Sequence, residues 1–236
     1  MKSLQVITLG CSKNTVDTEH LLSQVKGSWE ILPEEESRPV DVLLINTCGF
    51  IGDAKEESIQ AILAAAARKK AGEVGRIIVF GCLSQRYMSQ MPDLIPEVDY
   101  WFGARDLDPV VKALGCVPVR NPSRLRTDHH AYAYLKISEG CDRRCSYCAI
   151  PSIRGAHRSV PMEAIVAEAE SLAREGVKEL ILIAQDTTYY GLDLYRRRAL
   201  AELIRRLSAV SGIEWIRIHS VSYTHLRAHE TRGNLV

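Results

Sequence analysis

Short apolar runs alternate with longer amphipathic stretches over the first 116 residues. The runs are apolar almost throughout, which is typical of parallel strands buried on both faces. They predict strands at residues 4–9, 40–46 and 76–80, with a short strand near residue 100. The stretches between them predict helices at residues 12–25, 53–70, around 84–91 and after 108. The pattern therefore predicts a parallel-sheet βαβ domain over residues 1–116.

A second alternation of the same kind begins at residue 131. It predicts strands at 132–138, 178–185 and 214–218, separated by helices at 161–174 and 198–209. This strand–helix order is the beginning of a (β/α) barrel. Residues 117–130 contain Pro118 and Pro122 and no periodic pattern, so they are expected to form a linker. The predicted fold class is α/β, a parallel-sheet domain followed by the first half of a partial barrel.

Each of the first three strands ends at a cysteine beside a glycine. These cysteines are Cys11, Cys48 and Cys82. Parallel βαβ units place the carboxyl ends of their strands at one edge of a sheet, so the three residues are expected to converge there. The alternative is three structural core cysteines, because free cysteine is often buried.

Three further cysteines, Cys141, Cys145 and Cys148, follow the strand predicted at 132–138. Clustered thiolates are ligands for zinc or for an iron–sulfur cluster. A structural zinc ion requires a fourth ligand, whereas three thiolates on a cubane cluster leave one iron open to another ligand. A zinc knuckle therefore remains the alternative to a catalytic iron–sulfur site.

The Cys-x3-Cys-x2-Cys spacing, with Tyr147 before the last cysteine, resembles the cluster loop of the radical S-adenosylmethionine (SAM) enzymes. The resemblance implies that Cys141, Cys145 and Cys148 hold a four-iron four-sulfur cluster whose open iron binds SAM. Reductive cleavage of SAM would then provide a radical that abstracts hydrogen from carbon. Tyr147 is expected to pack near the SAM adenine.

Residues 1–116 resemble the N-terminal domain of the methylthiotransferases within that group. The matching segments are LGCSKN at 9–14, NTCGF at 46–50 and GCLSQR at 81–86. The resemblance implies that Cys11, Cys48 and Cys82 hold an auxiliary four-iron four-sulfur cluster, which carries the sulfur that is methylated and inserted. Cys116 has no counterpart in this pattern and is expected to be structural.

Two segments, 138–155 and 182–191, are similar to the branch that modifies ribosomal protein S12. That branch adds a methylthio group to the β-carbon of an aspartate. The alternatives are the sister branch, which modifies an adenosine in tRNA, and a non-catalytic metal-binding module associated with ribosomes or RNA. The segments 143–144, 154–155 and 185–188 are expected to border the SAM site, where the two substrates would be distinguished. Arginine there pairs with a carboxylate or with a phosphate, so the family resemblance and not this chemistry favours the aspartate.

The chain of 236 residues has an ordinary globular composition, with 46% hydrophobic and 25% charged residues. Its charge is uneven: residues 1–116 carry a net charge of −4 and residues 117–219 a net charge of +4, mostly from arginine. An arginine-rich half suits a polyanion such as the ribosome, although an ordinary solvated surface explains it equally well.

The sequence also leads to expectations about cellular context. Seven cysteines without a secretory signal argue against a disulfide framework, and no apolar run reaches the roughly 20 residues of a membrane span. A cytoplasmic monomer is expected, reduced by a flavodoxin or ferredoxin and acting on S12 or the small ribosomal subunit. Residues 220–236 depart from the family and resemble a translated sequencing adapter, so we expect a non-native tail after an incomplete radical SAM core at 131–219.

Overall fold

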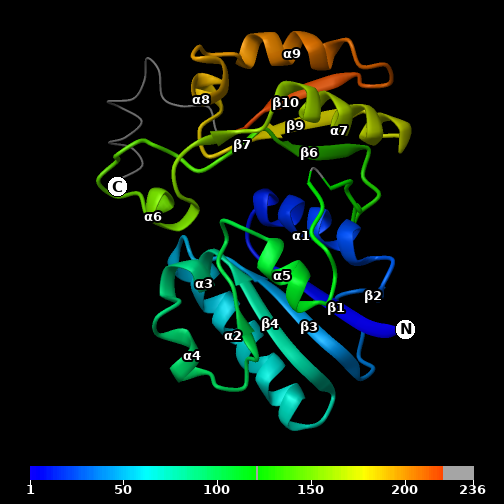
Figure 1. The fold of residues 1–236 in the computed structure, drawn as a ribbon, viewed down its shortest axis with the longest axis vertical. Helices are drawn as coiled ribbons and strands as arrows, with labels where there is room; N and C mark the ends of the chain where they lie inside the picture. Colours follow the sequence, from blue (N-terminus) through cyan, green and yellow to red (C-terminus); the bar gives the residue numbers. More distant parts are fainter. Residues whose placement is uncertain (121, 220–236) are drawn as a thin grey trace. The chain divides into compact units, whose positions relative to one another are not determined.

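The structure is a computed structural model that describes residues 1–120 and 122–219 (Figure 1). These residues form two compact units. The first contains Met1–His129 together with Asp142–Ala156, and the second contains His130–Cys141 together with the described residues from His157 onward. The tail predicted at 220–236 lies outside the described residues.

The first unit is built on a sheet of five parallel strands in the order β2-β1-β3-β4-β5 (Figure 1). The strands are β1 (Lys2–Thr8), β2 (Trp29–Leu32), β3 (Val40–Thr47), β4 (Val74–Gly81) and β5 (Tyr100–Trp101). The edge strand β2 has no counterpart among the predicted elements. It is only four residues long, and Trp29 is held by a hydrogen bond of 2.9 Å from its indole nitrogen to the Leu114 carbonyl.

Helices cover both faces of this sheet. They are α1 (Ser12–Val25), α2 (Gly52–Lys70), α3 (Cys82–Tyr87), α4 (Met91–Leu94) and α5 (Asp108–Ala113). A further helix, α6 (Ile150–Arg154), packs against α3. Successive residues of β3 point to opposite faces: Leu43 packs in the core with α2, and Leu44 packs in the core with α1 and α5. Burial on both faces explains why the strands read as continuous apolar runs, and the predicted βαβ architecture is confirmed.

The second unit contains three parallel strands in the order β10-β9-β6 and a short antiparallel pair, β7 with β8. Its strands are β6 (Tyr132–Lys136), β7 (Ser138–Glu139), β8 (Arg158–Ser159), β9 (Glu179–Ile183) and β10 (Trp215–Ile218). Its helices are α7 (Met162–Arg174), the single 3-10 turn η1 (Thr187–Tyr189), α8 (Leu192–Tyr195) and α9 (Leu200–Ser208). Alternate apolar residues of β6 and β9 pack with α7 and α9, which confirms the predicted first strands of a (β/α) barrel.

The described residues of the predicted linker at 117–130 contain no helix or strand, and several of them contact α1 in the first unit. Glu19 of α1 is almost fully buried and accepts a hydrogen bond of 2.5 Å from the Arg124 guanidinium. The same carboxylate accepts a hydrogen bond of 2.9 Å from the Thr127 backbone. This segment is therefore fastened along α1.

Candidate metal centres

The three N-terminal cysteines lie directly after the carboxyl ends of three adjacent parallel strands. Cys11 is the N-cap of α1 after β1, Cys48 follows β3, and Cys82 is the first residue of α3 after β4. These strands are neighbours in the order β1-β3-β4, so the cysteines meet at one edge of the sheet, as the sequence predicts.

Glycines allow the backbones at this edge to approach closely. A β-carbon added to Gly10 would lie 2.5 Å from the Cys48 β-carbon, and one added to Gly49 would lie 2.9 Å from the Cys82 backbone carbonyl carbon. Neither position has space for a side chain. Gly81 also has a φ of +106°, which L-residues rarely adopt. The glycine beside each cysteine is thus required by the close approach of the segments that carry them.

The environments of the three thiols differ. Cys48 and Cys82 are buried and Cys11 is exposed. Burial raises the pKa of the Cys82 thiol; the nearby Arg154 guanidinium opposes that shift, and Cys11 and Cys48 add to it. A cation bound among these thiols would favour the thiolates that metals require.

Within the described part of the chain, no group of three or more histidine, cysteine, aspartate or glutamate side chains is arranged to hold a metal ion as it stands. The backbones converge, but the sulfur atoms do not form a ready ligand set. The donor chemistry nevertheless fits an iron–sulfur cluster, because three thiols from three segments surround one glycine-lined edge.

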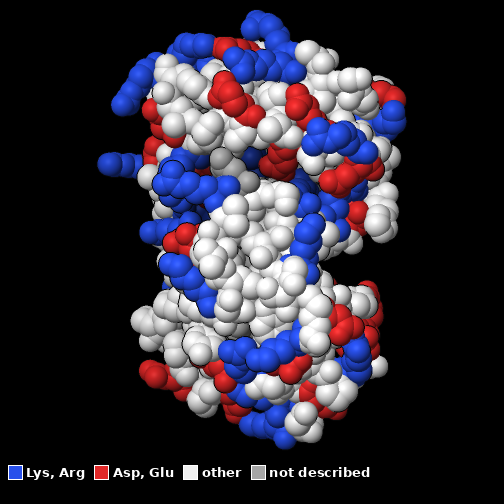
Figure 2. Space-filling view, turned by 45° about the vertical axis from the view of Figure 1, so that its right-hand side comes forward, with Lys and Arg blue, Asp and Glu red and all other residues white. Residues whose placement is uncertain are grey.

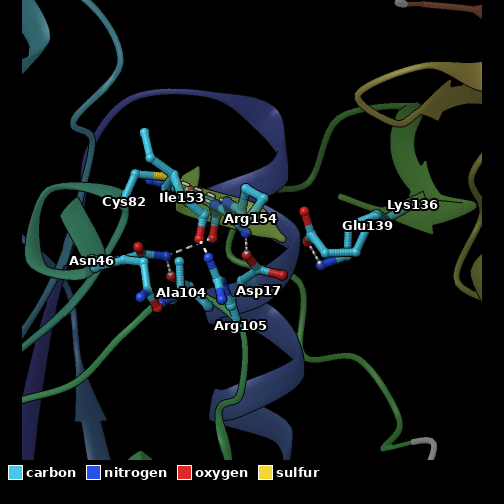
Figure 3. Close-up of polar contacts among 12 residues, drawn as sticks. Asp17, Asn46, Cys82, Ala104, Arg105, Lys136, Glu139, Ile153 and Arg154 are labelled. Atoms are coloured by element: carbon cyan, nitrogen blue, oxygen red, sulfur yellow. Dashed lines mark hydrogen bonds and ion pairs between the residues drawn. The ribbon is translucent and has the colours of Figure 1, made fainter. Parts of the chain in front are cut away.

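Arg154 makes polar contacts with Cys82, Asp17 and Asn14 beside this edge, and Figure 3 labels the first two of these partners. Its Nε lies 3.2 Å from the Cys82 sulfur, its Nη1 donates to the Asp17 carboxylate at 2.7 Å, and its Nη2 donates to the Asn14 side-chain oxygen at 2.5 Å. Only 3% of Arg154 is exposed. The expectation that Arg154 pairs with a substrate is wrong, because its donors face protein groups in the first unit.

The second cysteine loop is placed differently. Cys141 ends the first segment of the second unit, whereas Cys145 and Cys148 belong to the segment 142–156 that is part of the first unit. The Cys148 backbone nitrogen donates to the Cys145 carbonyl at 3.1 Å, so these two cysteines share one turn. Cys145 is exposed and the other two are partly exposed.

Tyr147, between these cysteines, is 54% exposed. Its packing against the SAM adenine stays a prediction. Arg144 is exposed and Arg143 is partly exposed, so both stay candidates for substrate contact.

Polar side chains also gather at the carboxyl ends of β6 and β9 in the second unit. Glu139 accepts a hydrogen bond of 2.9 Å from the Lys136 ammonium and another from the Gln185 amide. Asp186 is used locally, since it caps η1 by accepting from the Thr188 backbone at 3.0 Å. Glu139 and Lys136 were not singled out by the sequence pattern, because a strand-end carboxylate becomes notable only when its partners are known.

Cys116 packs at the edge of the core shared by α1 and α5, and its sulfur lies 3.9 Å from the Leu114 carbonyl. This position is consistent with the structural role expected for it.

Among the described helices, none is long and apolar enough to cross a membrane.

Comparison with known proteins identifies two family models that match the chain. Residues 3–103 match the family described as Uncharacterized protein family UPF0004, and residues 135–227 match the Radical SAM superfamily. The chain is similar to structures of the cobalamin-dependent SAM radical enzyme OxsB, with a TM-score of 0.58 and 13% identity over 88% of this chain and 36% of that one. It is also similar to the radical SAM methyltransferase TsrM from Kitasatospora setae, with a TM-score of 0.55 and 13% identity over 89% of this chain and 53% of that one. These similarities establish the radical SAM fold.

Curated relatives of this chain indicate which kind of radical SAM enzyme it resembles. The chain is 52% identical, over 92% of its length, to the ribosomal protein uS12 methylthiotransferase RimO of Flavobacterium johnsoniae, and covers 50% of that protein. It is 50% identical, over 92% of its length, to the protein of the same name from Porphyromonas gingivalis, again covering 50% of it. The chain thus matches a UPF0004 model and a Radical SAM model over separate segments, and it spans about half the length of these methylthiotransferase relatives. The Radical SAM match implies SAM and one four-iron four-sulfur cluster as cofactors.

Proposed function

We propose that this chain is part of an enzyme that adds a methylthio group to an aspartate β-carbon of ribosomal protein S12. The observation that carries the proposal is the convergence of Cys11, Cys48 and Cys82 at one sheet edge. A radical SAM enzyme without sulfur insertion needs only one cluster loop, so a second set of three cysteines points to a second cluster. The names of the curated relatives support the S12 substrate.

Each set of three cysteines would hold one cluster. Cys141, Cys145 and Cys148 would hold the cluster that binds SAM, and Cys11, Cys48 and Cys82 would hold the auxiliary cluster. When bound, the first cluster would provide the electron for SAM cleavage, and the second would carry the sulfur that is methylated and inserted. Burial of Cys48 and Cys82 would keep water away from the second site. We further propose a cytoplasmic monomer that takes electrons from a flavodoxin or ferredoxin.

The substrate is tested with the chain extended after residue 219 by the C-terminal half of the Flavobacterium johnsoniae relative. The reconstituted protein is supplied with SAM, sulfide and a reductant, and offered either S12 or unmodified tRNA. Mass spectrometry should show a methylthio group on an S12 aspartate and none on the tRNA. Modification of tRNA alone would assign the chain to the adenosine-modifying branch.

Matched cysteine variants connect the activity to the two sites. Cys148→Ala should abolish both SAM cleavage and transfer, because the SAM-binding iron is lost. Cys82→Ala should abolish transfer and retain SAM cleavage. Cys116→Ala, which changes a thiol in the core and not at the sheet edge, should retain both activities. Loss of SAM cleavage in Cys82→Ala would contradict the division of roles.

A further inference from the structure

The guanidinium of Arg154 is held by residues of the first unit. Asp17 of α1 provides the opposite charge, and both side chains are buried, with 2% of Arg154 and 7% of Asp17 exposed. The same unit contributes Asn14 as an acceptor, and also Cys82, which Figure 3 shows beside Arg154. Arginine does not lose its proton in proteins, so a fixed positive charge lies against the Cys82 sulfur.

Asn14 explains why the guanidinium adopts this orientation. The Asn14 amide nitrogen donates to the carbonyls of Leu9, at 2.7 Å, and Thr47, at 3.2 Å. Because both amide hydrogens point at those carbonyls, the Asn14 oxygen must face Arg154. With Asn14 and Asp17 accepting from the two terminal nitrogens, the Nε–H of Arg154 is the donor that points at Cys82.

We propose that Arg154 is a positioning residue of the auxiliary site, whose Nε–H donates a hydrogen bond to the Cys82 sulfur and thereby raises the reduction potential of a cluster bound there. The proposal rests on the proposed function, since it requires Cys82 to be a cluster ligand. Hydrogen bonds to ligand sulfurs and nearby charge are among the factors that set the potentials of iron–sulfur clusters. A reduced cluster carries one more negative charge than an oxidised one, so a buried donor and cation stabilise the reduced form.

The sequence position of Arg154 gives this contact a second consequence. Arg154 ends α6, six residues after Cys148, and its segment 142–156 also carries Cys145. The hydrogen bond to Cys82 therefore fastens the segment that holds two predicted ligands of the SAM cluster to a ligand of the auxiliary cluster.

The test uses the 236-residue chain with Cys141, Cys145 and Cys148 changed to Ala, so that iron binds only at the auxiliary site. Arg154→Gln is combined with Asp17→Asn, because the pair then loses both charges and leaves no unpaired carboxylate buried. Iron content is measured first, and the reduction potential is then titrated by electron paramagnetic resonance of the reduced cluster. We expect unchanged iron content and a more negative potential in the double variant.

Arg105→Gln is the matched control. Arg105 donates to the carbonyls of Ile153, at 3.1 Å, and Ser152, at 2.5 Å, so it holds the same α6 through backbone carbonyls. Its loss should leave the potential unchanged. An equal shift in Arg105→Gln and the double variant would overturn the proposal, because the position of α6 would then be the cause.

The outcomes separate this proposal from the proposed function. Absence of iron in the protein with intact Arg154 would mean that Cys11, Cys48 and Cys82 hold no cluster, and both would fail. Normal iron with an unchanged potential in the double variant would refute only the role of Arg154. If the double variant loses iron, Arg154→Lys is tested instead, because it keeps the charge but changes the donor geometry. This variant should retain iron and shift the reduction potential by a smaller amount. An unchanged potential in Arg154→Lys would refute the role of Arg154.

Discussion

At the scale of single residues, Asp41 of β3 shows how one surface carboxylate makes stability depend on pH. The Ser3 backbone N–H and hydroxyl both donate to it, at 2.8 Å and 3.0 Å, and hold the pKa of the Asp41 carboxyl below its ordinary value. A lowered pKa in the folded state means that the ionised carboxylate stabilises the fold above the unfolded-state pKa, and that this contribution disappears as the pH falls through the folded-state pKa.

We therefore expect Asp41→Asn to be less stable than the unchanged chain at neutral pH and to lose less stability on acidification. The measurement is urea unfolding at several pH values between neutrality and about pH 3, below the ordinary aspartate pKa. Ser3→Ala should reproduce part of the effect, because the backbone donor remains. A parallel pH profile in Asp41→Asn and the unchanged chain would contradict this assignment.

Arg154 shows what a sequence does not reveal about a residue. Its position shortly after the cysteine loop led to the expectation of a substrate contact, and the residue type was well suited to that role. Its actual partners are Asp17 and Asn14, 137 and 140 positions away in the chain. Pairing over such a separation follows from how the segment 142–156 packs in the first unit, and no local pattern encodes it.

At the scale of helices and strands, the pattern of apolar residues was sufficient to predict each strand that is buried on both faces. The apolar run at 40–46 became β3, and the cysteine that follows it lies where parallel topology requires. The missed elements are short: β2 has four residues and α6 has five. Their stability comes from tertiary contacts, such as the hydrogen bonds from Arg105 to α6, and helices of that length are not stable by propensity alone.

The segment 117–129 gives a testable case of such contacts. Glu19→Ala would leave Arg124 buried without its carboxylate and would also remove the acceptor of the Thr127 backbone. Breaking a buried pair in this way costs about 3–5 kcal/mol. We expect trypsin to cleave the folded protein faster after Arg124 and Arg126 in this variant, as followed by mass spectrometry of the fragments.

The control for this experiment is Glu30→Ala, which removes an exposed partner of Arg38. Exposed pairs contribute roughly 0–1 kcal/mol, so cleavage after residues 124 and 126 should not change. Equal rates in Glu19→Ala and the unchanged chain would mean that the segment is accessible without breaking the Glu19 contacts.

At the scale of the whole molecule, the uneven charge of the sequence has a structural explanation. Several of the arginines that make residues 117–219 basic form ion pairs in the second unit, including Arg206 with Glu163 at 3.1 Å and Arg217 with Glu179 at 2.7 Å. Figure 2 shows basic and acidic side chains interspersed over the visible face. The arginine bias therefore supports the interpretation of a solvated surface, and the proposed S12 substrate is supported by the names of the relatives.

The metal content of the chain tests both cysteine sites together. If each set of three cysteines binds a four-iron cluster, anaerobic reconstitution should give about eight irons per chain with the visible absorption of iron–sulfur clusters. Cys11→Ala, Cys48→Ala and Cys82→Ala should each remove about half of that iron, because loss of one thiolate disrupts one cluster. Cys116→Ala should remove none. Stoichiometric zinc with no visible absorption would support the non-catalytic metal-binding module. If Cys116→Ala loses as much iron as Cys82→Ala, the ligand sets are assigned wrongly.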